Sequence, residues 1–149
     1  MKLETSSKSI NLVLKTRKIV SIANALKNKK FEEAFFIALR ECEIEALSKI
    51  IFILAEDENG KNPFSGSEEV YDFIDEYKAE KNKTYVDIYN DIAKVINEEG
   101  FFNMKMTEEE LEAKTNDLMS SVNLEDIIKS ATEKATVNVM AEEFQGFKA

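Results

Sequence analysis

Histidine is absent from this sequence of 149 residues, and its absence removes several kinds of chemistry. Histidine is the usual general base of enzymes and the commonest protein ligand of metal ions. Catalytic arrangements of the Ser-His-Asp or Cys-His kind therefore have no base. Cysteine occurs once, as Cys42, so a zinc site of several cysteine and histidine ligands cannot be built within one chain. We expect no catalytic residue, no metal ligand and no cofactor.

Glycine and long apolar runs are also scarce. The glycines stand apart, so the sequence has no glycine-rich loop to bind phosphate. The longest uninterrupted apolar run, residues 50–55, is far shorter than the ~20 residues that cross a bilayer. The first residues lack the apolar stretch of a signal peptide. A single cysteine forms no internal disulfide, which favours a reducing compartment, and we expect a cytoplasmic protein without membrane contact.

Charge is acidic overall and unevenly spread. The formal net charge is −9, but residues 1–30 hold eight Lys and Arg against the single acid Glu4, which gives +7. Residues 31–149 hold 12 basic and 28 acidic side chains, which gives −16. An acidic body disfavours nucleic-acid binding, because phosphate affinity comes from clustered cations. The basic segment is free to pair with the acidic remainder or with an acidic partner, and the plainer alternative is a solvated surface.

Apolar spacing predicts a mainly α-helical fold. Residues 8–15 alternate with period two and predict a half-buried strand, with which residues 2–5 pair across Ser6 and Ser7. Apolar side chains then recur at helical spacing up to Gly100, which has the position of a C-terminal helix cap. We expect a bundle of four or more helices after a short N-terminal strand or hairpin. Its helices include residues 31–41 and 43–56, and the predicted N-caps of others are Thr16, Ser67 and Thr84.

The amino-acid composition changes after Phe102. Residues 103–122 are rich in Met, Thr, Glu, Lys and Ser and have few large aliphatic side chains. Apolar residues return at helical spacing from Leu124 to Ala135, behind a predicted cap at Asn123. We therefore predict two parts: a helical domain with its N-terminal strand over 1–102, and a flexible acidic extension over 103–149 with a C-terminal amphipathic helix.

Two pairs of adjacent phenylalanines and an unusually apolar helix are the best candidates for a binding surface. Neighbouring residues of a helix point about 100° apart, so both rings of a pair are buried only if the helix is covered on more than one side. Supply of an ordinary core is one interpretation. Exposed aromatic clusters are also typical interface anchors, which makes a partner groove the alternative. The candidate partner-binding residues are Phe35, Phe36, Ile50, Phe52, Phe101 and Phe102.

The order of these features resembles the tail assembly chaperones of long-tailed phages and prophages of Gram-positive bacteria. The resemblance covers about residues 8–102 and is one of layout. Its segments are the strand Ser9–Lys15 leading into Thr16–Val20, the apolar run Ile50–Leu54, the segment Ser67–Ile74, and Glu98–Phe102 followed by an acidic tail.

The resemblance implies a function without catalysis or cofactor. It implies that the protein binds the long hydrophobic tape-measure protein in the bacterial host cytoplasm, and that it helps tail-tube subunits to polymerise around that protein. It also implies a longer, frameshifted product that shares the N-terminal part. Self-association is a further expectation, because the apolar surplus of residues 31–41 and 43–56 exceeds what one small domain buries.

Two other function classes remain open from the sequence. One is a small acidic helical adaptor or regulatory protein that binds a host or phage protein. The other is an enzyme that uses carboxylates alone, for which Asp72 with Glu76 and Asp87 with Asp91 lie at helical spacing i, i+4. Charge opposite an apolar stripe is what any amphipathic surface helix shows, so a solvated face is the simpler interpretation of both pairs.

Overall fold

A three-stranded antiparallel sheet opens the fold. The computed structural model describes residues 1–115, which start with a hairpin of β1 (Lys2–Glu4) and β2 (Ser9–Leu12). Leu3 lies opposite Ile10, which confirms the predicted pairing. The turn lacks glycine and is held by the Thr5 hydroxyl, which accepts the backbone N–H of residue 8 at 3.1 Å. A third strand, β3 (Ala55–Glu56), pairs with the other edge of β2.

Five helices follow the hairpin within residues 16–98, so the predicted mainly helical fold is confirmed. None of the helices within residues 1–115 is long and apolar enough to cross a bilayer. A further helix begins at Glu108. The five helices are α1 (Thr16–Ala25), α2 (Phe31–Glu41), α3 (Ile44–Leu54), α4 (Ser67–Lys81) and α5 (Tyr85–Glu98).

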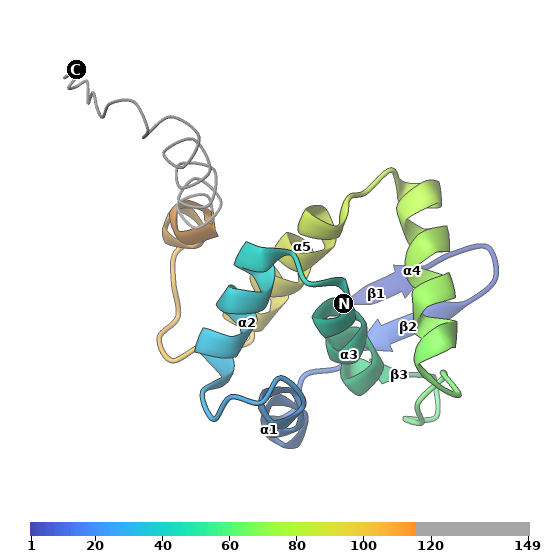
Figure 1. Ribbon diagram of the computed structural model, residues 1–149, viewed down its shortest axis with the longest axis horizontal. Helices are drawn as coiled ribbons and strands as arrows, with labels where there is room; N and C mark the ends of the chain where they lie inside the picture. Colours follow the sequence, from blue (N-terminus) through green and yellow to red (C-terminus); the bar gives the residue numbers. More distant parts are fainter. Residues whose placement is uncertain (116–149) are drawn as a thin grey trace, which may run out of the picture. The chain divides into compact units, whose positions relative to one another are not determined.

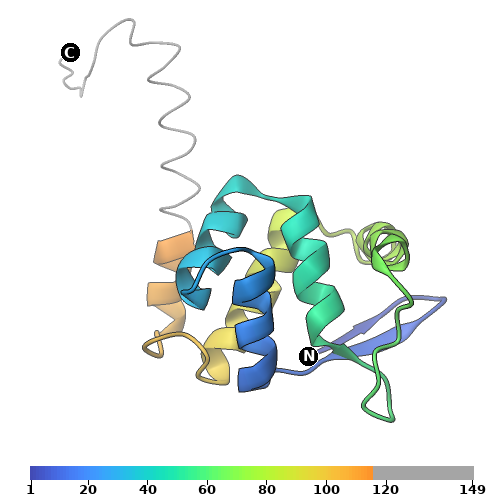
Figure 2. The ribbon, with the colours of Figure 1, turned by 60° about the horizontal axis from the view of Figure 1, so that its bottom comes forward.

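Helix α3 is the central element. It packs against α1 and α4 and leads directly into β3, and Figures 1 and 2 show it between α2 on one side and α4 with the hairpin on the other. This position explains why its sequence is apolar over most of its circumference. The carbonyl of Leu54 at its end accepts the N–H of Val13 at 2.9 Å and the ammonium of Lys18 at 3.1 Å. Lys18 also pairs with Glu56 at 2.6 Å, so one cation ties α1, α3 and β3 together.

The predicted helix starts are correct at one place and wrong at two. Thr84 caps α5 through a reciprocal pair of hydrogen bonds with Asp87, the capping box. Thr16 and Ser67 are instead the first helical residues of α1 and α4, and neither helix has a side-chain cap bond. At the other end of α5, Gly100 takes φ +79° and the N–H of the next residue returns to the carbonyl of residue 96 at 3.0 Å, as expected of a C-terminal cap.

The chain divides into two units, of which the first is Met1–Leu111. Asn97 in α5 joins the segment after α5 to this unit, because its side chain exchanges hydrogen bonds of 2.7 and 2.8 Å with the backbone of Met106. The predicted boundary near residue 103 therefore lies inside the unit. Residues 116–149, including the predicted amphipathic helix that starts after Asn123, lie outside the described residues.

Candidate functional site

Three of the six predicted partner-binding residues meet in an aromatic cluster. The rings of Phe36 and Phe102 stack with centroids 5.1 Å apart, and Phe35 makes an edge contact with Phe36 at 5.6 Å. Phe31 stacks on Phe102 at 6.2 Å, and Tyr89 of α5 contacts Phe35 at 5.9 Å. Each of these five side chains is at most 8% exposed. Phe102 of the second pair thus packs against both rings of the first pair, and these rings lie between α2, α5 and the segment after α5.

The structure corrects the expectation that all six residues line one exposed groove. Phe35, Phe36 and Phe102 are buried in the cluster, and Ile50 is buried in α3 with no exposed surface. Helix α2 is covered on more than one side, so both rings of its pair reach the core. Phe52 and Phe101, the other two candidates, are half-buried. The aromatic cluster is therefore core, and a binding surface has to be sought elsewhere in the unit.

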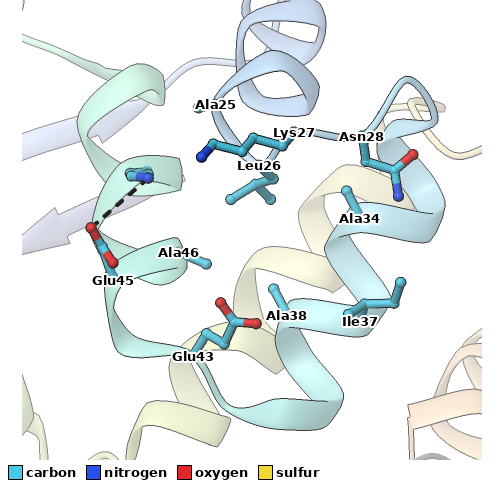
Figure 3. A pocket seen from close by; sticks show the side chains of 11 residues that line it. Ala25, Leu26, Lys27, Asn28, Ala34, Ile37, Ala38, Glu43, Glu45 and Ala46 are labelled. Carbon is cyan, nitrogen blue, oxygen red and sulfur yellow. Dashed lines mark ion pairs between the residues drawn. The ribbon is translucent and has the colours of Figure 1, made fainter.

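A pocket of about 260 Å³ opens where α1, α2 and α3 meet. Its lining includes the alanines Ala34 and Ala38 of α2 and Ala46 of α3, with Leu26 and Ile37 beside them, as Figure 3 shows. Alanine methyl groups at these three positions leave space that larger side chains would fill. Small-molecule pockets usually enclose about 300–1,000 Å³, so this hollow suits apolar side chains projecting from a partner better than a free ligand.

The two ends of the pocket are helix ends of the same geometry. Lys27 follows α1 with φ 59°, and Cys42 follows α2 with φ 51°. After each of them the next backbone N–H donates to a carbonyl five residues earlier, Asn28 to Ala23 and Glu43 to Ala38, both at 3.0 Å. This is the Schellman pattern, which satisfies carbonyls at a helix end and turns the chain sharply. The turns place Lys27 at one side of the pocket and Glu43 at the opposite side (Figure 3).

Charged groups of both signs surround the apolar floor. Lys49 and Glu45 of α3 form a loose pair at 3.9 Å beside Lys27 and Glu43. Removal of water around Glu43, followed by the hydrogen bond and charge of the neighbouring Glu41 carboxyl, raises the pKa of Glu43. The Tyr89 hydroxyl donates to the Glu43 carbonyl at 2.6 Å and holds this turn against α5. The three alanines are at most 5% exposed, so the polar and charged groups around them form most of the surface that the site presents to solvent.

Three of the four carboxylates considered for acid–base chemistry have structural partners. Glu76 accepts the Ser7 hydroxyl at 2.7 Å, and hydrogen bonds from the hydroxyls of residues 5 and 7 lower its pKa. Asp91 pairs with Lys83 at 2.7 Å, and Asp87 belongs to the cap of α5. Among residues 1–115, no group of three or more Cys, Asp or Glu side chains is placed to hold a metal ion.

The pocket was not predicted from the sequence, although a weak signal for it exists. Ala34 and Ala38 stand at spacing i, i+4 on α2, so they lie on one face of the helix and leave it narrow. The third alanine, Ala46, belongs to another helix, and its approach depends on the turn at Cys42. Small residues at i, i+4 are also frequent in tightly packed cores, so the spacing alone does not separate a closed contact from an open pocket.

Comparison with known proteins adds no constraint on the site. The chain matches no family model, no curated protein and no solved structure. Function is therefore inferred from the pocket, the charge distribution and the resemblance of sequence layout.

Proposed function

We propose that this chain is a non-catalytic binding protein that takes apolar side chains of a partner helix into the α1–α2–α3 pocket, and that it acts as a tail assembly chaperone of a long-tailed phage. The pocket is the observation that supports binding: a hollow between three helices that is lined by three buried alanines and opens to solvent among charged side chains. The sequence resemblance supports the identity of the partners, which are the tape-measure protein and the tail-tube protein.

Exposed apolar side chains also occur on the helices that border the pocket. Within residues 1–115, four large apolar side chains are exposed, and two of them, Val20 at 54% and Ile44 at 44%, lie on α1 and α3. Neither of the two lines the pocket, and isolated exposed apolar residues are ordinary on protein surfaces. The pocket itself therefore carries the proposal.

A partner held in this way is released readily. Burial of apolar surface yields about 25 cal/mol per Å², so a shared patch of ~400 Å² gives on the order of 10 kcal/mol before costs. Loss of rotational and translational freedom offsets an estimated 4–15 kcal/mol of that. Weak, reversible contact suits a chaperone that hands its client to a growing tail tube, and the net charge of −9 keeps the complex from aggregating.

Exchange of Ile37 for serine tests the pocket. Ile37 is half-buried in the pocket wall, so the change removes apolar contact with a partner at a cost in stability of about 1–2 kcal/mol. We expect Ile37→Ser to weaken capture of the partner about tenfold or more, measured as the amount retained on the immobilised full-length chain. Ile53→Ser is the matched control, because Ile53 is also a half-buried helical isoleucine but does not line the pocket.

The partner's identity is tested by affinity capture from a host that carries the phage, read by mass spectrometry. Tape-measure or tail-tube peptides that are retained by the native chain and the Ile53→Ser control, and lost with Ile37→Ser, support the chaperone. A transcription factor in their place favours the regulatory adaptor. Equal retention by all three proteins shows that the pocket is not the binding site.

A further inference from the structure

The hairpin leaves one edge of the sheet open. The strand order is β1–β2–β3, so β1 is an outer strand, and among residues 1–115 no strand pairs with its far side (Figure 1). An open edge presents backbone N–H and C=O groups with which a further strand can pair. The hairpin turn is fixed to α4, because the Ser6 N–H donates to Glu80 at 3.0 Å. The Ser7 hydroxyl donates to Glu76 of the same helix at 2.7 Å. The edge is therefore ordered before any partner arrives, which lowers the cost of pairing.

The hydrogen bonds of the hairpin determine which backbone groups face this edge. The Thr5 N–H donates to the Lys8 carbonyl at 2.8 Å, so Thr5 directs its backbone groups towards the second strand of the hairpin. These directions alternate along an antiparallel strand, so Leu3 faces β2 in the same way. The N–H and C=O groups of Lys2 and Glu4 consequently point to the open edge.

The side chains of these two residues carry opposite charges. Lys2 and Glu4 are exposed on one face of the sheet, while Leu3 between them is buried on the other face. Within the hairpin they lie opposite Asn11 and Ser9, which are uncharged. Neither Lys2 nor Glu4 belongs to an ion pair within residues 1–115. The open edge therefore carries one positive and one negative charge, and both can meet the charges of another strand.

We propose that β1 pairs with β1 of a second copy of this chain, antiparallel and about a twofold axis at Leu3. In this register Lys2 of each copy lies opposite Glu4 of the other. Both residues face the edge, so each Lys2–Glu4 pair exchanges both of its N–H···O bonds. Opposite charges that face each other across two strands are stabilising as well. The two hairpins then form one continuous sheet with the same surface used by both copies.

The charge pattern selects this partner and this register. Charged side chains usually protect a short edge strand from pairing with other strands. A slip of the antiparallel register in either direction places Lys2 opposite Lys2 or Glu4 opposite Glu4, and parallel pairing also brings like charges side by side. Like charges in these positions are destabilising. The contact is separate from the α1–α2–α3 pocket, because no hairpin residue lines that pocket. The inference therefore does not depend on the proposed function.

Exchange of the two charges tests the pairing. Lys2→Glu places carboxylates opposite each other in both pairs, and Glu4→Lys does the same with ammonium groups. We expect each change to weaken self-association about tenfold, measured by sedimentation equilibrium of the full-length chain over a range of concentrations. The double variant Lys2→Glu with Glu4→Lys should associate like the native chain. An equal mixture of the two single variants should do so too, because opposite charges meet again between unlike chains.

Two controls and one backbone measurement accompany these variants. Lys94→Glu and Glu98→Lys match the changes in net charge, because both residues are exposed on α5 and lie outside the sheet. Each should leave self-association unchanged. The amide of Glu4 reports the pairing itself: its N–H faces the open edge in a single chain and is hydrogen-bonded in the pair. Its hydrogen exchange should slow as the concentration rises, while that of Leu3, which already faces β2, should change less.

Several outcomes would overturn the inference. One is a native chain that stays monomeric at the highest concentrations. Another is self-association that Lys2→Glu and Glu4→Lys leave intact, or that the α5 controls weaken equally. A mixture of the two single variants that associates no better than either variant alone also contradicts the proposed register. Self-association that is lost with Ile37→Ser and kept in the charge variants would place the contact at the pocket instead of the sheet edge.

Discussion

At the scale of single residues, Phe102 is a core residue although it lies beyond the end of α5. The centroid of its ring lies within 6.2 Å of the ring centroids of Phe31, Phe35 and Phe36. A single side chain from the segment beyond α5 therefore completes the packing of α2. Aromatic pairs in tilted and offset geometry contribute about 0.5–1.5 kcal/mol each beyond their buried area. The segment after α5 is therefore part of the core through this side chain.

We expect Phe102→Ala to lower the free energy of unfolding by about 3–5 kcal/mol, because it leaves a cavity among three rings that cannot close around it. The measurement is the denaturant midpoint followed by circular dichroism. Met104→Ala is the control, since Met104 is 79% exposed and its loss should change stability by less than about 0.5 kcal/mol. A small effect of Phe102→Ala, comparable with that of Met104→Ala, would contradict the assignment of this ring to the core.

At the scale of elements, three similar residues at helix starts show what local pattern predicts and what it does not. Thr84, Thr16 and Ser67 all precede an amphipathic run, yet Thr84 alone of the three caps its helix. Asp87, three residues after Thr84, returns a bond to the cap and fixes its extended backbone. In α1 and α4 no side chain makes this return bond. Thr16 and Ser67 are then themselves helical, so each helix begins one residue earlier than predicted.

Replacement of Thr84 by alanine should cost about 1 kcal/mol of stability, because the backbone N–H of Asp87 loses the hydroxyl that accepts its hydrogen bond. Thr16→Ala provides the control: Thr16 is also the threonine of a helix start, but its hydroxyl makes no cap bond. We expect the control to lie within about 0.5 kcal/mol of the native chain in the same urea titration. Equal losses for both variants would show that the capping box does not stabilise α5.

The helices were largely predictable because their signal is local, and the pairing of distant segments was not. Periodicity predicted residues 31–41 as a helix with the bounds that the structure shows. It also predicted a helix over residues 43–56, whereas Ala55 and Glu56 leave α3 and pair with β2. That exit depends on the edge of a strand far earlier in the chain. The pocket escaped prediction for the same reason, since its lining comes from three helices and two turns.

At the scale of the whole molecule, several carboxylates tie stability to pH. The hydrogen bond from Lys18, and then that from Lys15, lowers the pKa of Glu56 below its ordinary value of 4.5. Backbone and hydroxyl donors at residue 84 lower the pKa of Asp87 in the same sense. A carboxyl with a depressed folded pKa stabilises the protein above its unfolded pKa, and this contribution disappears as the pH falls through the folded value. Glu43 opposes this trend, because its raised pKa favours proton uptake by the folded state.

We therefore expect the urea midpoint to fall as the pH is lowered below about 4.5. Glu56→Gln should destabilise the chain at about pH 7, and its difference from the native chain should shrink as the pH falls through the lowered pKa of Glu56, because protonation of this carboxyl removes the same contact. Glu58→Gln is the control, because Glu58 is exposed in the following loop and belongs to no ion pair within residues 1–115. A difference between Glu56→Gln and the native chain that persists unchanged at low pH would contradict the role given to the Lys18 contact.

The pairing of Leu12 with Ala55 also has a consequence for the order of synthesis. It closes a loop of about 40 residues, and every residue that lines the pocket lies between these two positions. The ribosome has therefore made the whole pocket before it makes α4 and α5. Tyr89, whose hydroxyl donates a hydrogen bond to the Glu43 carbonyl and holds that turn, is made later. Closure of such a loop is entropically costly by itself. During synthesis, all residues of the pocket are thus present for some time before α4 and α5, which pack against the elements around the pocket, have been made.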